Sequence, residues 1–209
     1  VCSDTRLGLG LLAKAWRRRF SLPLVAVTGN SGKTTVKEMT AALLAPLGKV
    51  LATTGNLNND IGAPLTLLGL GPAHRYAVVE LGANHLGEIA WTTALARPQV
   101  AVITNVTGAH VGEFGGMGQI AQAKGEILSG LPPEGVAVLN RDDAFYPFWQ
   151  RLAGQRRVID FGLSTPAPEE SWPSEDGRTT KTRRRPVALV GTPAYMAPEQ
   201  IDLGVASAV

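Results

Sequence analysis

Residues 28–35 read TGNSGKTT and combine glycines, a lysine and hydroxyl side chains in an order suited to phosphate binding. They fit the pattern G-x-x-G-K-T, a shortened relative of the phosphate-binding loop, with Thr28 where the longer pattern has its first glycine. Lys33 would bring positive charge to β- and γ-phosphates, and the Thr34 hydroxyl could hold Mg²⁺. The sequence therefore predicts a nucleotide site formed by Gly29, Asn30, Ser31, Gly32, Lys33, Thr34 and Thr35; the alternative is an ordinary strand-to-helix turn.

Apolar residues precede this loop at 22–27, and good helix formers follow it at 36–44. This order predicts strand, loop and helix, so that the first amides of the helix and its dipole point at a phosphate. Gly29 and Gly32 permit backbone angles closed to other residues, which allows a close approach to a ligand.

Short apolar stretches and helix-type stretches alternate along the rest of the chain. Strands are predicted at 50–54, 76–81, 100–105, 135–140 and 157–161, and helices at 64–68, 89–96 and 120–128. This alternation predicts an α/β fold with a mostly parallel sheet and helices on both faces. Ligands bind beyond the carboxyl ends of such strands, so the polar residues there should gather around the loop: Thr28, Glu80, Thr104, Asn105 and Asn140.

A helix is predicted over residues 4–20, before the first strand. Leu7, Leu11, Leu12 and Ala15 recur in it at helical spacing, and Asp4 or Thr5 could cap its start. The run 17–19 consists of three arginines, which we interpret as a solvated last turn favoured by the helix dipole.

The composition suits a soluble globular protein. The chain has 209 residues, 44% of them hydrophobic and 18% charged, with a net charge of +3 and one cysteine. No apolar run approaches the ~20 residues of a membrane span, and the charge is too small to indicate nucleic-acid binding. We therefore expect a cytoplasmic protein with no nucleic-acid or membrane partner. The N-terminus shows no basic region followed by an apolar one, so we expect no signal peptide, and it lacks an initiator Met, so we expect a fragment of a longer protein.

Several segments together resemble the ATP-dependent Mur ligases of peptidoglycan synthesis. They are TGNSGKTTVKEM at 28–39, GNLNNDIGAP at 55–64, ELGANHLGEI at 80–89, ITNVTGAHVGEFG at 103–115, AKGEI at 123–127 and NRDD at 140–143. The resemblance covers about residues 3–164 and corresponds to the central ATP-binding domain of the family, whose N- and C-terminal domains are missing from this chain.

The resemblance implies an ATP-dependent ligase that transfers the γ-phosphate of ATP to a carboxylate, after which an amine attacks the acyl phosphate and forms an amide. Within the family it implies addition of D-alanyl-D-alanine to UDP-MurNAc-tripeptide, with ATP and Mg²⁺ as cofactors, by a protein expected to be monomeric. By itself the fragment is expected to be inactive. A non-catalytic ATP–Mg²⁺ binding fragment and a ligase similar to folylpolyglutamate synthetase remain as alternatives.

The resemblance also implies roles for residues around the metal ions. Thr34 and Glu80 would hold the first Mg²⁺, and His110 a second. Lys124 corresponds to the lysine that many Mur ligases carry as a carbamate, which would hold or orient the second metal. Lys33, Lys124 and His110 are thus the expected catalytic residues. Three alternatives remain: Glu80 could cap a helix or form an ion pair, His110 could be a polar loop residue, and Lys124 could be a surface lysine.

Further side chains are implied as ligand contacts. Asn140 corresponds to the family's adenine contact. Its amide offers both a donor and an acceptor, as an adenine edge requires. Asn56, Asn58 and Asn59 correspond to the loop that faces the muramoyl-peptide substrate. All four are also common in turns, and that alternative stays open.

We expect three parts: a lead-in helix at 1–20, the ATP-binding domain at 21–164, and a disordered linker and tail at 165–209. The tail is poor in apolar residues as far as 186. Residues 190–199 (VGTPAYMAPE) resemble the end of a protein-kinase activation segment. Asp160, Phe161 and Gly162 also spell a kinase triplet, but they fit a strand of the ligase domain equally well, and we interpret the triplet as coincidence.

Overall fold

The computed structural model describes residues 3–107 and 116–163. Its helices and strands are, in order, α1 (Thr5–Arg17), β1 (Leu24–Thr28), α2 (Lys33–Leu44), η1 (Ala45–Leu47), β2 (Val50–Ala52), α3 (Gly62–Leu68), β3 (Tyr76–Glu80), α4 (Glu88–Ala96), β4 (Val100–Ile103), α6 (Met117–Gly125), η2 (Glu126–Gly130), β5 (Val136–Asn140), α7 (Tyr146–Ala153) and β6 (Arg157–Phe161). The expectations for His110 and for the tail from 165 lie outside the described residues.

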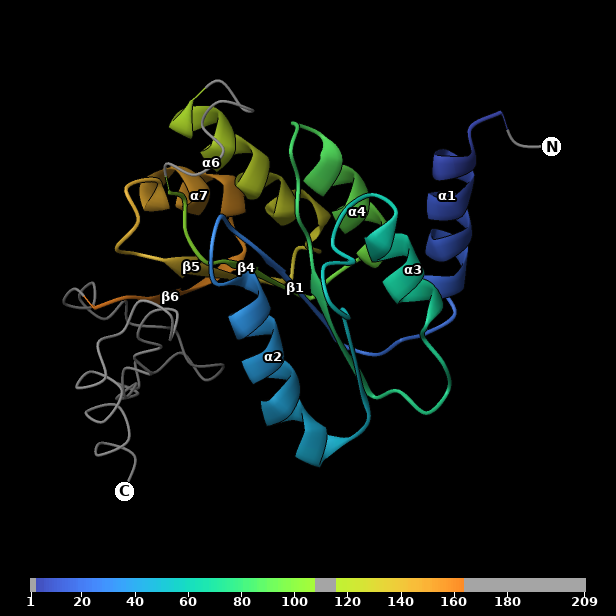
Figure 1. Ribbon diagram of the computed structural model, residues 1–209. Coiled ribbons are helices and arrows are strands. Elements are labelled where there is room, and N and C mark those ends of the chain that lie inside the picture. The colour runs from blue at the N-terminus through green and yellow to red at the C-terminus, as the bar shows by residue number, and fades with distance from the viewer. Residues whose placement is uncertain (1–2, 108–115, 164–209) are drawn as a thin grey trace.

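The strands form one six-stranded sheet in the order β2-β3-β1-β4-β5-β6, and every neighbouring pair is parallel. The phosphate loop follows β1, which lies inside the sheet between β3 and β4. All the strands therefore end at the same edge of the sheet, and the loop lies at the centre of that edge (Figure 1).

Helices cover both faces of the sheet, which confirms the predicted fold class. Val27, Val78 and Val102 pack toward α2 on one face, against Val36, Ala41 and Leu44 among others. The neighbouring positions of the same strands face a larger core on the opposite face, where α1, α3, α4, α6 and α7 lie (Figure 1). Side chains alternate between the two faces along a strand, so continuously apolar strands are buried on both.

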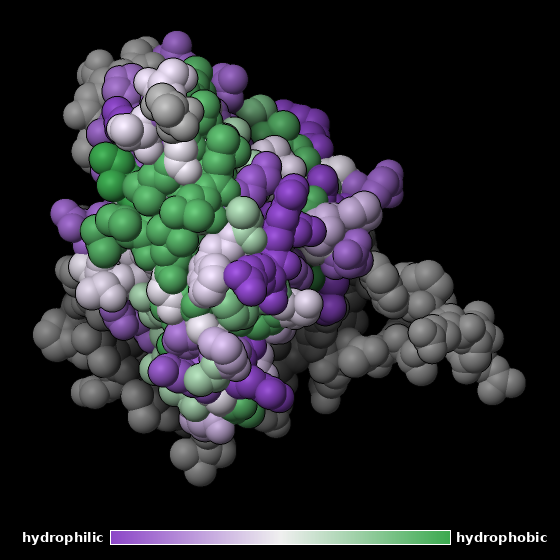
Figure 2. All heavy atoms as spheres, turned by 90° about the vertical axis from the view of Figure 1, so that its right-hand side faces the viewer, coloured by the Kyte–Doolittle hydropathy of each residue, from purple (hydrophilic) through white to green (hydrophobic). Residues whose placement is uncertain are grey.

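The N-terminal helix is confirmed, but its orientation is not the one its leucines indicate. Leu7, Leu11 and Leu12 are 45%, 49% and 59% exposed, and Figure 2 shows a hydrophobic area on the side of the molecule where α1 lies. The buried residues are instead Gly10, Ala13 and Arg17. Small residues face the core because α1 packs closely on its neighbours: a Cβ at Gly10 would lie 2.5 Å from the Trp91 ring.

The expectation that Arg17 belongs to a solvated turn is wrong. Arg17 is only 4% exposed, and its guanidinium donates to the carbonyl oxygens of Ala96 at 2.9 Å, Phe20 at 2.6 Å and Leu22 at 3.2 Å. A guanidinium carries five donors in a fixed geometry, so a single side chain can satisfy several carbonyls at a helix end. Arg17 thus ties the end of α1 to the end of α4 and to the chain leading into β1.

The helix α7 is an element that we did not predict. Pro147 lies in its first turn, and Trp149 and Ala153 are fully buried one helical turn apart. The Trp149 indole also donates to the Ala121 carbonyl at 2.9 Å, which fixes α7 against α6. A proline in the first turn and apolar residues at this spacing were the available signal.

Candidate nucleotide and magnesium site

The loop between β1 and α2 has the backbone that its glycines permit. Gly29 has φ +140° and Gly32 has φ +79°, both in the region that favours glycine. A Cβ at Gly29 would lie 1.9 Å from the Thr104 hydroxyl oxygen, so the loop and β4 leave no space for a side chain there. Gly32 is the N-cap of α2 and offers no side-chain cap, which leaves the amides of the first turn available to an anion.

Two residues after β4 hold the loop in place. The Thr104 hydroxyl donates to the Ser31 carbonyl at 2.6 Å, and the Asn105 side-chain oxygen accepts from the Ser31 amide at 3.0 Å and from its hydroxyl at 3.1 Å. The Asn30 amide donates to the Asn105 carbonyl at 3.0 Å. The polar residues that follow β4 therefore gather on the loop, as the sequence predicted.

Lys33 folds back over the loop that precedes it. Its ammonium donates to the carbonyls of Gly29 at 2.9 Å and Asn30 at 3.3 Å. Burial lowers the pKa of Lys33, and the negative charge of Glu80 opposes that shift. The lysine is therefore held over the loop, where its charge lies beside the helix N-terminus.

Glu80 ends β3 and lies 2% exposed beside the start of α2. One carboxylate oxygen accepts from the Thr34 hydroxyl at 2.9 Å, and the other accepts from the Asn58 amide at 2.7 Å. Mg²⁺ prefers hard oxygen ligands and is commonly held by one or two carboxylates together with substrate phosphates. The donor set of Thr34 and Glu80 fits that ion. Within residues 3–107 and 116–163, no group of three or more His, Cys, Asp or Glu could form a protein-only metal site.

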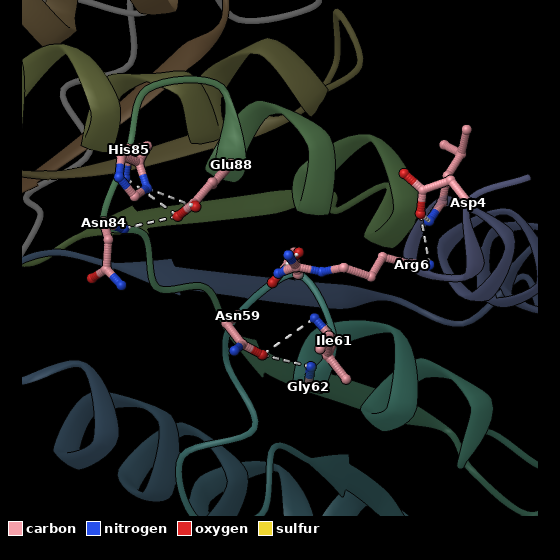
Figure 3. A network of polar contacts seen from close by, with 10 residues as sticks. Asp4, Arg6, Asn59, Ile61, Gly62, Asn84, His85 and Glu88 are labelled. Atoms are coloured by element: carbon pink, nitrogen blue, oxygen red, sulfur yellow. Dashed lines mark hydrogen bonds and ion pairs between the residues drawn. The ribbon is translucent and has the colours of Figure 1, made fainter.

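A cavity of about 600 Å³ opens beside the loop. Most of its lining side chains are polar or charged: Arg6, Asn30, Lys33, Asn56, Asn58, Asn59, Asp60, Asn84, His85, Glu88 and Lys124. All three predicted substrate-facing asparagines are among them. Asn59 also shapes the turn before α3, because its side-chain oxygen accepts from the amides of Ile61 at 3.2 Å and Gly62 at 2.8 Å (Figure 3). For Asn59 the turn-forming role is observed, and it coexists with a place in the cavity wall.

Lys124, on α6, is 4% exposed and lines the same cavity. Burial and the nearby charge of Lys33 lower the pKa of Lys124 to about 8, against the opposing influence of Glu126 and Glu88. Near neutral pH an appreciable fraction of this amine is uncharged, and the neutral amine is the nucleophilic form.

Asn140 lies outside this cavity wall, at the end of β5. Its side-chain amide donates to the Thr104 carbonyl at 3.0 Å, and its side-chain oxygen accepts from the Asp142 amide at 3.0 Å. The Asp143 carboxylate accepts hydrogen bonds from the backbone amides of Val106 at 2.6 Å and Phe145 at 2.9 Å. These bonds place Asn140 in a turn that is tied to β4, next to the phosphate loop.

Two polar contacts in the cavity wall were not predicted as functional. Arg6 and Asp60 form an ion pair across the start of α1 and the asparagine-rich loop. The His85 ring contacts Glu88 at 3.1 Å, and Glu88 also accepts from the Asn84 amide at 2.8 Å (Figure 3). Burial acts to raise the pKa of Glu88, but these hydrogen bonds outweigh it and lower the pKa. Arg6 and Asp60 are distant in sequence, and His85 and Glu88 lie at an exposed turn, so residue spacing in the sequence did not indicate either contact.

Asp160 lies in β6 and not in a kinase-type loop. Its side chain accepts from Arg141 at 3.3 Å across the β5–β6 pair. Asp160 and Phe161 are thus the last two residues of β6, and Gly162 follows the strand, which agrees with the interpretation of the triplet as coincidence. No helix of the described residues has the length and apolar character needed to span a membrane.

A parallel sheet with a glycine-bracketed Lys-Thr loop at the end of an internal strand defines an α/β nucleotide-binding domain. Residues 27–193 match the family model of the Mur ligase middle domain. The chain belongs to the Mur ligase family.

Three of the proteins similar to this chain are ligases of one kind. The UDP-N-acetylmuramoyl-tripeptide–D-alanyl-D-alanine ligase of Escherichia coli (strain K12) is 53% identical over 161 residues, which are 77% of this chain and 36% of that protein. A crystal structure of MurF from Acinetobacter baumannii superimposes with a TM-score of 0.76 at 47% identity, covering 78% of this chain and 36% of that one. A crystal structure of MurF from Thermotoga maritima in complex with ADP superimposes with a TM-score of 0.72 at 34% identity, covering 79% of this chain and 38% of that one. The chain thus spans little more than a third of the length of its relatives.

Proposed function

We propose that this chain is the ATP-binding domain of a ligase that joins D-alanyl-D-alanine to UDP-MurNAc-tripeptide through an acyl phosphate. The observation that carries the proposal is the 2.9 Å contact between Thr34, which follows the phosphate-loop lysine, and Glu80, at the end of the neighbouring strand. The 53% identity to the Escherichia coli ligase supports the choice of substrates.

In this proposal the chain binds and orients the triphosphate. The first-turn amides of α2 would receive phosphate oxygens, and Lys33 would exchange its contacts with Gly29 and Asn30 for the β- and γ-phosphates. Thr34 and Glu80 would hold Mg²⁺, which supplies positive charge where negative charge develops during phosphoryl transfer. Asn140 would contact adenine through the hydrogen-bonding capacity left on its amide.

The acceptor substrate would occupy the cavity beside the loop. Asn56, Asn58 and Asn59 line it and would contact the muramoyl-peptide. Because Asn58 also donates to Glu80, the peptide carboxylate would be bound close to the triphosphate, as direct transfer of the γ-phosphate requires.

Lys124 is the residue that we propose to carry a carbamate. The ammonium would first lose one proton, and the neutral amine would then attack CO₂, forming an N–C bond and releasing a second proton, so that overall a cation becomes an anion. Its burial in the cavity wall and the proximity of the Lys33 charge support this, because both disfavour a protonated lysine. The anion would hold or orient a second Mg²⁺ together with His110, which lies outside the described residues. ATP and a UDP-linked precursor as substrates favour a cytoplasmic location, and a monomer is the proposed state.

The test is a chimera in which residues 3–163 replace the corresponding segment of the Escherichia coli ligase. We expect it to convert UDP-MurNAc-tripeptide, D-alanyl-D-alanine and ATP to the amide product, ADP and phosphate. The same chimera with Lys33→Ala should lose about a hundredfold or more of the rate. A chimera that folds and binds ATP with Mg²⁺ but forms no amide would contradict the ligase assignment.

A second candidate is a non-catalytic ATP–Mg²⁺ binding domain, because the phosphate loop and the Thr34–Glu80 pair account for nucleotide and metal binding without ligation. The isolated chain and the chimera separate the two. Nucleotide binding by both with turnover only by the chimera would mean that the domain is competent and needs the remaining domains.

A further inference from the structure

Lys37 is a buried cation that the proposed reaction does not use. It lies on α2, one turn after the phosphate loop, with 1% of its surface exposed. Its ammonium donates to the Thr53 carbonyl at 2.7 Å and lies 2.7 Å from a carboxylate oxygen of Glu38, whose side chain is 66% exposed. Burying an ammonium is costly unless its partners are well placed, so the contact with Thr53 is a strong constraint on both residues.

Thr53 connects this lysine to the candidate metal site. It follows β2, its amide donates to the Val78 carbonyl at 3.1 Å, and its hydroxyl oxygen accepts from the amide of Glu80 at 3.0 Å. Thr53 is 2% exposed. Its carbonyl and hydroxyl therefore join the Lys37 ammonium on one side to the Glu80 backbone on the other.

We propose that Lys37 is a positioning residue, which holds Thr53 so that Thr53 fixes the backbone of Glu80 and thereby the carboxylate that faces Thr34. The proposal rests on the proposed function in taking Glu80 as a Mg²⁺ ligand. Lys37 itself would contact neither nucleotide nor metal, because it is buried and does not line the cavity beside the loop.

The position of Glu80 matters because of the coordination geometry of Mg²⁺. Mg²⁺ requires nearly ideal octahedral geometry, so a small displacement of one carboxylate weakens its binding. Residues that orient a ligand without touching the metal typically change metal affinity by about tenfold or more when they are replaced. Lys37 and Thr53 hold Glu80 from its backbone, whereas Thr34 and Asn58 contact the carboxylate.

The first readout is amide hydrogen exchange of the nucleotide-free chain. Lys37→Met keeps the length of the apolar stem and removes the ammonium, and Lys49→Met makes the same change at an exposed lysine. We expect Lys37→Met to speed exchange of the Glu80 amide about tenfold, with little change at Lys49→Met. Unchanged exchange at Glu80 in a folded Lys37→Met variant would overturn the proposal.

The second readout is ATP binding by calorimetry, with Mg²⁺ and with a chelator. Lys37→Met should reduce the Mg²⁺-dependent gain in affinity about tenfold and leave binding in chelator unchanged. Equal losses in both conditions, or a loss in neither, would contradict a positioning role. If the parent chain binds no Mg²⁺–ATP, the metal site of the proposed function fails, while the exchange measurement still decides whether Lys37 positions Glu80.

A second variant covers the case in which Lys37→Met does not fold. Thr53→Val keeps the β-branched shape and the carbonyl that Lys37 contacts, and removes only the hydroxyl that accepts from Glu80. It should show the same faster exchange at Glu80 and the same weakened response to Mg²⁺. Parent-like behaviour of Thr53→Val would exclude the connection from Lys37 through Thr53 to Glu80.

Discussion

The Thr34 hydroxyl and the Glu80 carboxylate are 46 residues apart in sequence and meet at 2.9 Å. Thr34 lies in the first turn of α2, after the phosphate loop, and Glu80 ends β3, the strand beside β1. Parallel pairing of β1 and β3 brings them together, so the sheet itself assembles a pair of hard oxygens next to an anion-binding helix terminus.

Replacement of Glu80 by glutamine tests this pair. Glu80→Gln removes the charge and places an amide group opposite either Thr34 or Asn58, where both neighbours donate. We expect the Mg²⁺-dependent part of ATP affinity to fall at least about tenfold, and the free energy of unfolding to fall by about 1–3 kcal/mol. Calorimetry and denaturant unfolding measure the two. Glu134→Gln, at an exposed position, is the control; full Mg²⁺ dependence in Glu80→Gln would rule out Glu80 as a ligand.

The backbone of the phosphate loop is tested at Gly29. Gly29→Ala places a Cβ on the Thr104 hydroxyl and breaks its 2.6 Å bond to Ser31, so nucleotide binding should be lost together with about 2–3 kcal/mol of stability. Gly55→Ala is a matched control, because Gly55 also has a positive φ but no atom lies within 4 Å of its Cβ position. Similar effects of the two substitutions on ATP binding would argue against the close approach of the loop and β4.

The buried Lys124 gives a prediction about pH. Its pKa falls from 10.5 to about 8 on folding, so between these values the unfolded chain binds more protons, and stability rises with pH. Going from pH 7 to pH 10 in CO₂-depleted buffer should stabilise the parent relative to Lys124→Met by about 2–3 kcal/mol. Lys49→Met should follow the parent. If the free energy of unfolding of the parent and of Lys124→Met changed with pH in the same way, folding would not lower the pKa of Lys124.

Carbamate formation on Lys124 can be observed directly. Carbon NMR of the chain in ¹³C-bicarbonate near pH 8 should show a carbamate signal from Lys124, since the neutral amine is then well populated. Lys124→Arg should lack it. A parent spectrum without the signal, recorded with Mg²⁺ and ATP present, would count against the carbamate.

Arg17 tests the attachment of α1. Arg17→Met leaves three carbonyl groups without their donor, and we expect a loss of about 3 kcal/mol in the free energy of unfolding. Arg18→Met, at the exposed C-cap of the same helix, should change stability by less than about 0.5 kcal/mol. Equal effects at the two positions would be inconsistent with the observed contacts.

Most of the fold was predictable because the strands are continuous apolar stretches and the polar residues that follow them mark one edge of the sheet. The predicted meeting of Glu80, Thr104 and Asn105 around the loop required only parallel pairing. The spacing of apolar residues gave a wrong prediction where packing against other elements decides which side of a helix is buried. The leucines of α1 indicated a buried face, but the close approach of Trp91 favours the small residues Gly10 and Ala13.

The buried polar contacts of Lys37 and Arg17 could not be predicted from the sequence. Lys37 and Arg17 look like solvated charges in the sequence, and only the positions of Thr53 and Ala96, far along the chain, make them buried donors. Hydrogen bonds between distant residues depend on the packed structure and leave no periodic pattern. The roles assigned to Asn140 and the asparagine loop stay predictions, although their positions near the phosphate loop agree with them.

The most direct test of the nucleotide site is ATP binding by calorimetry in the presence of Mg²⁺, comparing the chain with Lys33→Ala. We predict that the parent binds one nucleotide per chain and that Lys33→Ala, with its fold verified by circular dichroism, binds at least about tenfold more weakly. Equal affinities in the two proteins, or no binding by the folded parent, would contradict the assignment of residues 29–35 as the phosphate-binding loop.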